Sequence, residues 1–293
     1  GGKLLSSCRW ERREKREKRE KRRSAPSNET RLPAGEASGV KLATLKIDRP
    51  KTVSERRDGR LLVVHPGHTR AAVVPASEIP NLLSAVEDWP AAEPRLREID
   101  AELRAGSWPE VVDLERCKLM APLPRSYAWL DGSAFISHVI LVRKARGAEP
   151  PEDLRTVPLM YQGISDFLLG PQDDIPLIDE AHGMDFEAEV GVILDEVPPG
   201  TPAAAAGRRI LLLTLMNDVS LRNLIPRELK AGFGFFHGKP SSSFAPFAVT
   251  PDEAGEAWRD GRLHLDMLSA YTGISIKKGL LKRMESLFAA HLE

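Results

Sequence analysis

From Lys118 onward the chain consists of short apolar runs separated by long loops rich in Gly, Pro and Asp, and this pattern is what most restricts the fold. The runs have the length of strands, and helical signals between them are sparse. Strands joined by irregular loops, without regular alternation with helices, predict an α+β or mainly-β sheet structure rather than a Rossmann fold. The predicted strands are 134–142, 185–194, 210–216, 244–250 and 263–268, with helices at 219–229 and 251–258.

The preceding segment, residues 40–117, predicts a small N-terminal α+β unit. Residues 41–47 show strand-like alternation, and 60–65 and 70–75 are further short strand candidates. Pro66-Gly67-His68 is expected to form the turn of a hairpin between the last two. Helices are expected at 77–88, capped by Ser77, and at 94–104, with Gly106 at its C-terminal cap. Nothing in this unit suggests chemistry.

Composition narrows the functional classes. Of the 293 residues, the first 40 hold 12 Lys and Arg against 6 Asp and Glu, whereas the remainder holds 30 against 36 and is mildly acidic. This balance disfavours a nucleic-acid partner for the remainder. No apolar run reaches the length of a membrane helix. Cys8 and Cys117 are the only cysteines, which excludes a disulfide framework and favours a reducing, cytoplasmic location.

Residues 1–39 form a charged leader whose core, Glu11–Arg23, reads ERREKREKREKRR. It is compatible with a solvated helix, with a nucleic-acid tail, or with a translated upstream region that is not native. Mixed charge signs argue against a strong polyanion binder, and no apolar stretch of a signal peptide is present. We favour the third interpretation, in which the protein begins near Val40, and treat the leader as disordered or not native.

The pentapeptide Asp185-Phe186-Glu187-Ala188-Glu189 carries the clearest chemical signal. In a strand, alternate residues share a face, so the three carboxylates are expected to point the same way. Carboxylates gathered on one face repel one another unless water or a cation balances them, and oxygen ligands select Mg²⁺, Ca²⁺ or Mn²⁺. The alternative is an exposed, solvated face of an antiparallel sheet.

Further candidates are weaker when taken singly. Asp218 ends the most apolar strand, where a carboxylate can face a site or cap a following helix. Asp131 and His138 flank the start of a predicted strand and could be a ligand and a base, although a lone His there can be a core residue. Lys239 follows the aromatic loop 233–238, where it is either partly desolvated or an ordinary loop lysine.

Taken in order, Asp…His, Glu-x-Glu, Asn-Asp and Lys-Pro resemble the fumarylacetoacetate hydrolase family. The resemblance runs from Val40 to about Met267. It is densest in YAWLDGSAFISHVILVRKARG, PLMYQGISDFLLGPQDDI, the segment 183–194, and MNDVSLRNLIPRELKAGFGFFHGKPSSSFAPFAVT. It implies an α+β fold: a mixed β-sandwich roll at 118–268 with a small N-terminal α+β domain at 40–117.

The resemblance also assigns roles. It implies divalent-metal ligands at Asp131, Glu187, Glu189 and Asp218, with Mg²⁺ expected first and Mn²⁺ or Ca²⁺ as alternatives. It implies His138 as general base, Lys239 as the active-site lysine, and an arginine of the site at Arg143 or Arg146. The expected partners are a small diketo or 2-oxo acid substrate and a second copy of the chain in a homodimer, with neither a membrane nor a nucleic acid.

Two departures from the family pattern affect the expected function. Ile225 and Leu229 occupy the approximate places of a Gln and a Tyr that touch substrate. Residues 269–293 lack the further strands and the Gly-Ser-Gly-Thr loop of the family, and instead carry a helical apolar stripe, so we expect an incomplete catalytic domain with an atypical helical tail. The leading hypothesis is hydrolysis of a carbon–carbon bond in a β-diketone. The alternatives are a 2-oxo acid decarboxylase or isomerase, and a truncated inactive relative.

Overall fold

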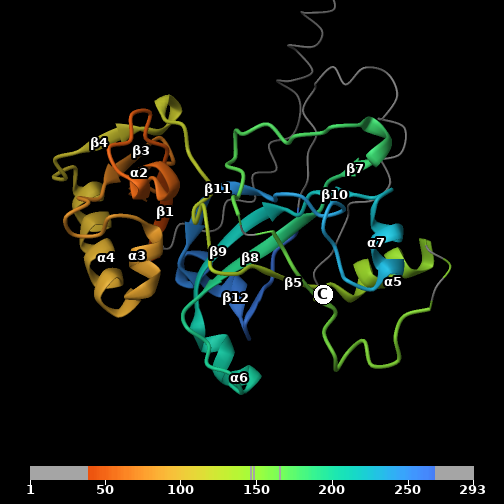
Figure 1. The fold of residues 1–293 in the computed structure, drawn as a ribbon. Helices are drawn as coiled ribbons and strands as arrows, with labels where there is room; N and C mark the ends of the chain where they lie inside the picture. The colour runs from red at the N-terminus through yellow and green to blue at the C-terminus, as the bar shows by residue number, and fades with distance from the viewer. Residues whose placement is uncertain (1–38, 146, 148, 165, 268–293) are drawn as a thin grey trace, which may run out of the picture. The chain divides into compact units, whose positions relative to one another are not determined.

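The computed structural model describes residues 39–145, 147, 149–164 and 166–267. Its main feature is a seven-stranded antiparallel sheet with the strand order β4-β3-β2-β1-β11-β9-β8 (Figure 1). The strands are β1 (Lys41–Leu45), β2 (Arg60–Val64), β3 (Arg70–Val73), β4 (Val111–Asp113), β8 (Ala188–Leu194), β9 (Ile210–Asn217) and β11 (Ser243–Val249). Because β1 pairs with β11, the sheet continues through strands on both sides of residue 117.

Three two-stranded sheets and several helices complete the described fold. The strand pairs are β5 (Leu130–Gly132) with β6 (Met160–Gln162), β7 (Met184–Asp185) with β10 (Ser220–Leu221), and β12 (Trp258–Arg259) with β13 (Arg262–Leu263). The α-helices are α2 (Val53–Asp58), α3 (Leu82–Glu87), α4 (Trp89–Ala105), α5 (Ile136–Ala145), α6 (Ala203–Ala206) and α7 (Ile225–Ala231). Short 3₁₀ turns are η1 (Leu114–Arg116), η2 (Glu180–His182), η3 (Gly207–Arg209) and η4 (Pro251–Ala257). This confirms the expected α+β class.

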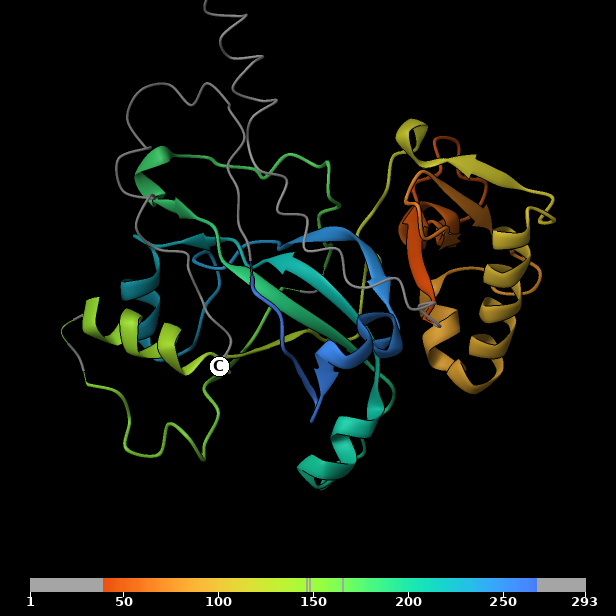
Figure 2. The same ribbon diagram turned by 180° about the vertical axis from the view of Figure 1, so that it is seen from behind.

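The core lies on both faces of β1–β3. Helix α4 lies along one face of these strands (Figure 2). On that face, the side chains of Leu61 and Val63 join one apolar cluster with those of Leu96, Ile99 and Leu103 from α4. On the opposite face, the intervening strand residues join a second apolar cluster that includes η1 and its neighbour Leu119. This two-residue alternation is what a strand buried on both faces requires. No helix of the described residues is long and apolar enough to cross a lipid bilayer.

The predicted hairpin is confirmed. Strands β2 and β3 pair antiparallel, and the backbone N–H of His68 donates to the carbonyl of His65 at 2.8 Å. His68 itself has a φ of 59°, a left-handed conformation that closes the turn.

Both N-terminal helices begin elsewhere than expected. Helix α3 begins at Leu82, where the side chain of Asn81 accepts the N–H of Ser84 at 2.9 Å, so Asn81 rather than Ser77 is the cap. Helix α4 begins at Trp89 and takes in Pro94, and its end at Gly106 in the left-handed region is as expected.

The largest correction concerns 134–142, which was expected to be a strand and is mostly helix α5. A short run that is apolar except for Ser137 and His138 shows no clear period that separates a helix from a strand, so only its length and surroundings could decide. The helix buries one side, with Val139 5% exposed, whereas Ile140 and Leu141 remain 46% and 44% exposed.

The remaining predicted elements are shorter or interrupted. The strand predicted at 185–194 is broken between β7 and β8, and the helix predicted at 219–229 is β10 followed by α7. The predicted helix at 251–258 is the 3₁₀ turn η4. The last predicted strand, 263–268, overlaps the short strand β13 (Arg262–Leu263) only at Leu263. Residue 268 and the predicted helical tail lie outside the described residues, as does the leader up to residue 38.

Candidate active site

Strand pairing brings the predicted carboxylates together from distant parts of the sequence. In the β5–β6 pair, Asp131 lies opposite Tyr161, and in the β8–β9 pair, Ala188 lies opposite Asn217. Glu187 therefore immediately precedes one strand of that pair and Asp218 immediately follows the other. Hydrogen bonds between these ends fix the geometry: the N–H of Asp218 donates to the carbonyl of Glu187 at 2.9 Å.

Asn217 gives this junction a second connection. Its side-chain oxygen accepts the N–H of Glu187 at 3.1 Å, at the point where β7 and β8 are interrupted. The interruption explains why 185–189 is not one regular strand. A buried N–H without a ladder partner needs another acceptor, and the amide of Asn217 supplies it.

Lys239 lies at the centre of the cluster. Its Nζ donates to Glu187 Oε2 at 2.7 Å and also to Asp218 Oδ2. All three side chains are buried, with residue exposures of 7%, 5% and 1% for Lys239, Glu187 and Asp218. The solvated-face interpretation is therefore wrong for Glu187, and Lys239 is no ordinary loop lysine. Asp218 does not cap a helix, since the next helix begins at Ile225.

Three residues that the sequence did not single out complete the network. Arg222 donates through Nε to Asp185 Oδ2 at 2.7 Å and through Nη2 to Glu187. The hydroxyl of Tyr161 donates to Asp218 Oδ1 at 2.7 Å, and Ser242 Oγ lies 3.4 Å from the same oxygen. All three lie in segments that resemble the family, and the resemblance was the only sequence signal for them.

The pKa values show how the charge is distributed. Burial, then the charge of Asp218, raises the pKa of Asp131 to about 6. Burial, then the charges of Asp131 and Glu187, raises that of Glu189 to about 8. Burial also raises the pKa of Asp218 and that of the Tyr161 hydroxyl. For Glu187, burial acts in the same direction, but Lys239 and Arg222 outweigh it and lower the pKa to about 2.

This donor set suits a hard divalent cation in its chemistry. It supplies carboxylate oxygens, and the raised pKa values of Asp131 and Glu189 indicate too little positive charge nearby. Among the described residues, no group of three or more His, Cys, Asp or Glu is arranged as a metal cage. Two side-chain cations lie in the arrangement: the ammonium of Lys239 joins Glu187 and Asp218, and the guanidinium of Arg222 joins Asp185 and Glu187.

The remaining predicted site residues all lie near or on α5. His138 is in the first turn of this helix rather than on a strand, and Arg143 is in its last turn. Within the described part of the chain, neither a hydrogen bond nor an ion pair connects Arg143 to the carboxylates. Arg146 lies outside the described residues.

Aromatic and apolar side chains border the cluster. The ring of Tyr161 stands edge-on to Phe235 with 5.0 Å between centroids, and Lys239 Nζ lies 5.4 Å from the Tyr161 ring centroid. Ile225 is buried at 1% exposure, whereas Leu229 is 43% exposed. The two positions expected to differ from the family therefore have different environments.

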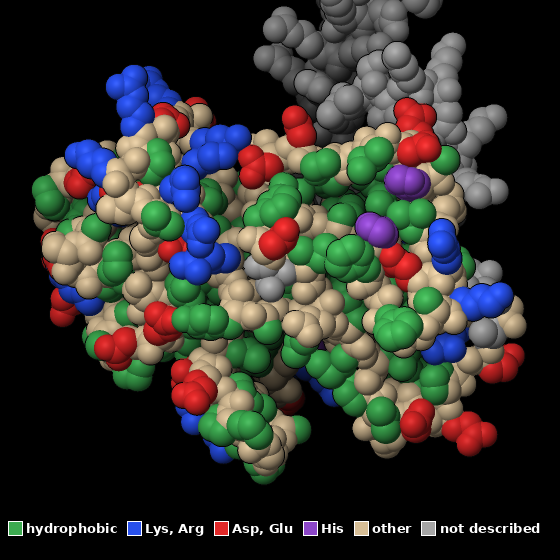
Figure 3. Space-filling view, viewed as in Figure 1, with side chains coloured by type: hydrophobic (Ala, Val, Ile, Leu, Met, Phe, Trp, Pro, Cys, Tyr) green, Lys and Arg blue, Asp and Glu red, His purple; other side chains and the backbone are tan. Residues whose placement is uncertain are grey.

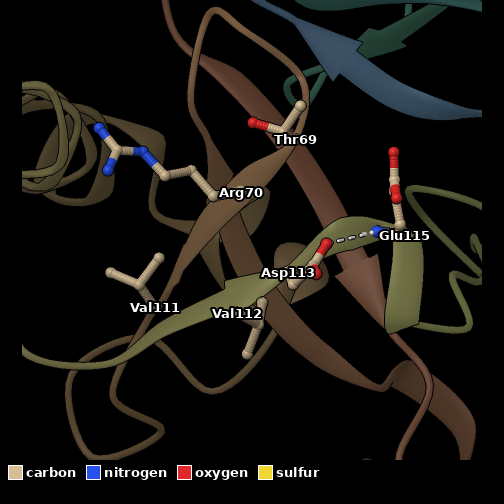
Figure 4. Close-up of a pocket in the computed structure, with 6 residues that line it drawn as sticks. All are labelled: Thr69, Arg70, Val111, Val112, Asp113 and Glu115. Carbon is tan, nitrogen blue, oxygen red and sulfur yellow. Dashed lines mark hydrogen bonds between the residues drawn. The ribbon is translucent and has the colours of Figure 1, made fainter.

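A separate hollow of about 530 Å³ lies along β3 and β4, far in sequence from the carboxylates (Figure 4). Its lining includes Arg70, Asp113 and Glu115. Asp113 accepts the N–H of Glu115 at 3.0 Å and so caps η1, which gives this carboxylate a structural role. Figure 3 shows one whole face of the molecule, on which acidic and apolar side chains lie between the basic ones.

The chain is similar to known proteins over most of its length. The model for the fumarylacetoacetase N-terminal domain 2 matches residues 40–125, and that for the fumarylacetoacetate (FAA) hydrolase C-terminal domain matches residues 128–282. A 2,4-didehydro-3-deoxy-L-rhamnonate hydrolase from Sphingomonas sp. is 30% identical over 132 residues, 44% of either chain. Protein Rv2993c from Mycobacterium tuberculosis is 30% identical over 117 residues, 40% of either chain. The chain spans less than half the length of the curated relatives it matches.

Two solved structures are similar to this chain, and the first of them shows the same fold. An HpcE-type protein from Mycobacterium smegmatis, 17% identical, superposes with a TM-score of 0.50 over 75% of this chain and 68% of its own. Maleylpyruvate hydrolase from Sphingobium sp., solved with manganese(II) and pyruvate, is 15% identical with a TM-score of 0.47 over 75% of this chain and 69% of its own. The C-terminal family match covers more than half of the chain, contains all the predicted site residues and runs past Met267, where the resemblance was expected to end. The chain belongs to the fumarylacetoacetate hydrolase family.

Proposed function

We propose that this chain is a divalent-metal-dependent hydrolase that cleaves a carbon–carbon bond of a β-diketone, an acylpyruvate such as fumarylacetoacetate. The observation that carries the proposal is the number of carboxylates gathered around buried Glu187 and Asp218: half-buried Asp131 and Glu189 have raised pKa values although Lys239 stands beside their neighbours. The Sphingomonas relative, a hydrolase of a didehydro-deoxy sugar acid, supports a small oxo acid as substrate. A homodimer and a cytoplasmic location are parts of the same proposal.

The divalent cation would be held by Asp131, Glu187, Glu189 and Asp218, with Mg²⁺ or Mn²⁺ as the candidates. Bound there, it would supply Lewis-acid stabilisation of negative charge on the substrate's oxygens and would orient them.

The chain's own residues supply the proton transfers. In the proposal, His138 takes a proton from water, and the resulting hydroxide adds to the distal carbonyl carbon. The carbon–carbon bond then breaks, and its electron pair leaves with the fragment that can delocalise it as an enolate. Lys239 stabilises the developing negative charge and assists the final protonation on carbon. Its buried position makes this charge interaction stronger than it would be in water.

Decarboxylation or isomerisation of a 2-oxo acid is the second candidate function. Ile225 and Leu229 occupy the approximate positions of a Gln and a Tyr that touch substrate in the family, so these two positions do not single out a diketone as the substrate. Both reactions need a stabilised enolate and so would use the same carboxylates and Lys239.

The test measures binding and activity separately. Mn²⁺ should raise the melting temperature of the purified chain, because a ligand that binds only the folded state stabilises it. The double variant Glu187→Ala, Glu189→Ala should lose this shift, whereas Glu196→Ala, an exposed glutamate just beyond β8, should keep it. An unchanged shift in the double variant would place the metal elsewhere.

Activity is then followed with an acylpyruvate and, in parallel, with oxaloacetate. The His138→Ala variant should lower kcat by about 10²–10⁴-fold while the Mn²⁺-induced shift persists, as expected for loss of a general base. Turnover of oxaloacetate alone would favour the second candidate function. If His138→Ala loses the metal shift as well, His138 is a ligand or a structural residue.

A further inference from the structure

One carboxylate outside the cluster holds three consecutive backbone N–H groups. Glu228, on α7, accepts from Phe236 at 3.1 Å, from His237 at 2.7 Å and from Gly238 at 3.0 Å. Burial raises the pKa of Glu228, but the three donors outweigh it and lower the pKa below its usual range. Hydrogen bonds to an ionised acceptor are about twice as strong as neutral ones, so this is a firm attachment of the loop to the helix.

The attachment requires glycine at position 238. A Cβ atom there would lie 2.8 Å from Glu228 Oε2 and 2.9 Å from Ile225 Cγ1, closer than side chains approach. The carbonyl of Gly238 also accepts the N–H of Leu221 at 2.8 Å, which ties the same residue to β10. Gly238 is thus fixed from two sides immediately before Lys239.

Apart from Glu228, the ring of Phe235, edge-on to Tyr161, helps to hold this loop. Phe233 is 97% exposed and Phe236 is 69% exposed, so their rings contribute little burial. Gly232 and Gly234 have φ values of 80° and 88°, conformations that other residues rarely adopt. Lys239 must nevertheless begin from a fixed backbone position if its Nζ is to stay between Glu187 and Asp218.

We propose that Glu228 is a positioning residue for Lys239: its carboxylate fixes the 236–238 backbone and thereby sets where the Lys239 ammonium meets the substrate. The expected effect of Glu228 on turnover rests on the proposed function. The effect on the position of Lys239 is independent of any substrate.

The first test is a double-mutant cycle on turnover. In Glu228→Gln, the side chain keeps its size but presents an NH₂ group to backbone N–H donors, so the loop attachment weakens. We expect kcat to fall about 10- to 100-fold with KM changed less than about 3-fold, since small misplacements of a reacting group have effects of this order. In a Lys239→Met background, the same change should cause no further fall. An equal fall in both backgrounds would overturn the proposal.

The second test needs no turnover. Limited acetylation, read by mass spectrometry, should modify Lys239 slowly in the native chain and at least several-fold faster in Glu228→Gln, whereas exposed Lys230 should react equally in both. Arg227→Gln, next to Glu228 on α7, is the matched control and should behave as the native chain does. Unchanged protection of Lys239, with faster amide exchange of residues 236–238, would overturn the proposal. Failure of all substrates with faster acetylation of Lys239 would instead contradict only the proposed function.

Discussion

The β1–β4 region with its three α-helices buries mainly apolar residues, whereas the carboxylate site buries charged ones. Around β2 and α4, the completely buried side chains are almost all apolar. Most charged residues there pair nearer the surface, as Arg95 does with Glu78 at 2.6 Å, and the buried exceptions, Asp58 and Asp100, each pair with an arginine. In the site, Glu187, Asp218 and Lys239 are at least as well buried as many core residues. The first region gains stability from apolar burial, whereas the second keeps charges out of water at a cost in stability.

The comparison shows how much surface charge pairs and buried charge pairs each contribute to stability. Surface pairs in the first region are screened by water and contribute little. Buried pairs in the second region depend on one another, because removing one partner leaves an uncompensated charge in a poorly solvated place. The following experiments test this contrast.

The largest expected effect is that of Lys239→Met. Without the ammonium, Glu187 and Asp218 face each other without their shared cation, and we expect the metal-free chain to lose about 3–5 kcal/mol of unfolding free energy. Urea unfolding measures this loss. Mn²⁺ should restore most of it, since a second cation replaces the first. A variant as stable as the native chain would show that the bridge is not needed.

Leu96→Ala should cost nearly as much by a different mechanism. Leu96 is completely buried in α4, and its truncation leaves a cavity worth about 2–5 kcal/mol. The same urea titration applies, but Mn²⁺ should not recover the loss beyond the shift that the native chain shows. Specific recovery by Mn²⁺ would mean that the two regions are energetically coupled.

The pH dependence of the melting temperature should also distinguish the two regions, with a smaller effect. The pKa of Glu189 is raised by burial to about 8, so its stabilising contribution is complete below its unfolded value near 4.5 and is lost as the pH rises through 8. The melting temperature of the metal-free chain should therefore fall between about pH 5 and pH 8.5. In Glu189→Gln, the part of the slope above pH 7 should disappear; an identical slope would show that Glu189 is ionised throughout.

The smallest effect is expected at the surface of the first region. Glu78→Gln removes one partner of Arg95, which also pairs with Glu98 at 3.1 Å and lies over the ring of Trp108. We expect a loss of less than about 1 kcal/mol, reduced further by added salt. A loss comparable to that of Lys239→Met would remove the contrast between surface and buried charge.

The first region was also the more predictable from sequence. Its hairpin strands are short apolar runs, and Pro66-Gly67-His68 between them is typical of a turn, so the hairpin could be located within a few residues. The cap at Asn81 was missed because Ser77 offers the same chemistry a few residues earlier, and only packing of the following residues decides between them.

In the site, the sequence indicated which residues matter but not how they are arranged. Local patterns suggested carboxylates at 185–189 and at Asp218, and the family resemblance added roles. The break in the strand at Glu187 could not be foreseen, because it depends on the side chain of Asn217, which comes from a distant strand. Arg222 and Tyr161 act through partners that are far away in sequence. Helix α5 around His138 was missed for a different reason, because its mostly apolar sequence fits either a helix or a strand.

The pairing of β1 with β11 has a consequence for synthesis. Lys41 lies opposite Val249, so an interior strand of the sheet waits for a partner that is made much later. At about 5–20 residues per second, that partner follows by roughly 10–40 s, while β1 to β4 can already pair among themselves. During this interval β1 is an exposed edge of a nascent sheet, open to pairing with another chain. Production of this protein should therefore depend on what covers that edge on the ribosome.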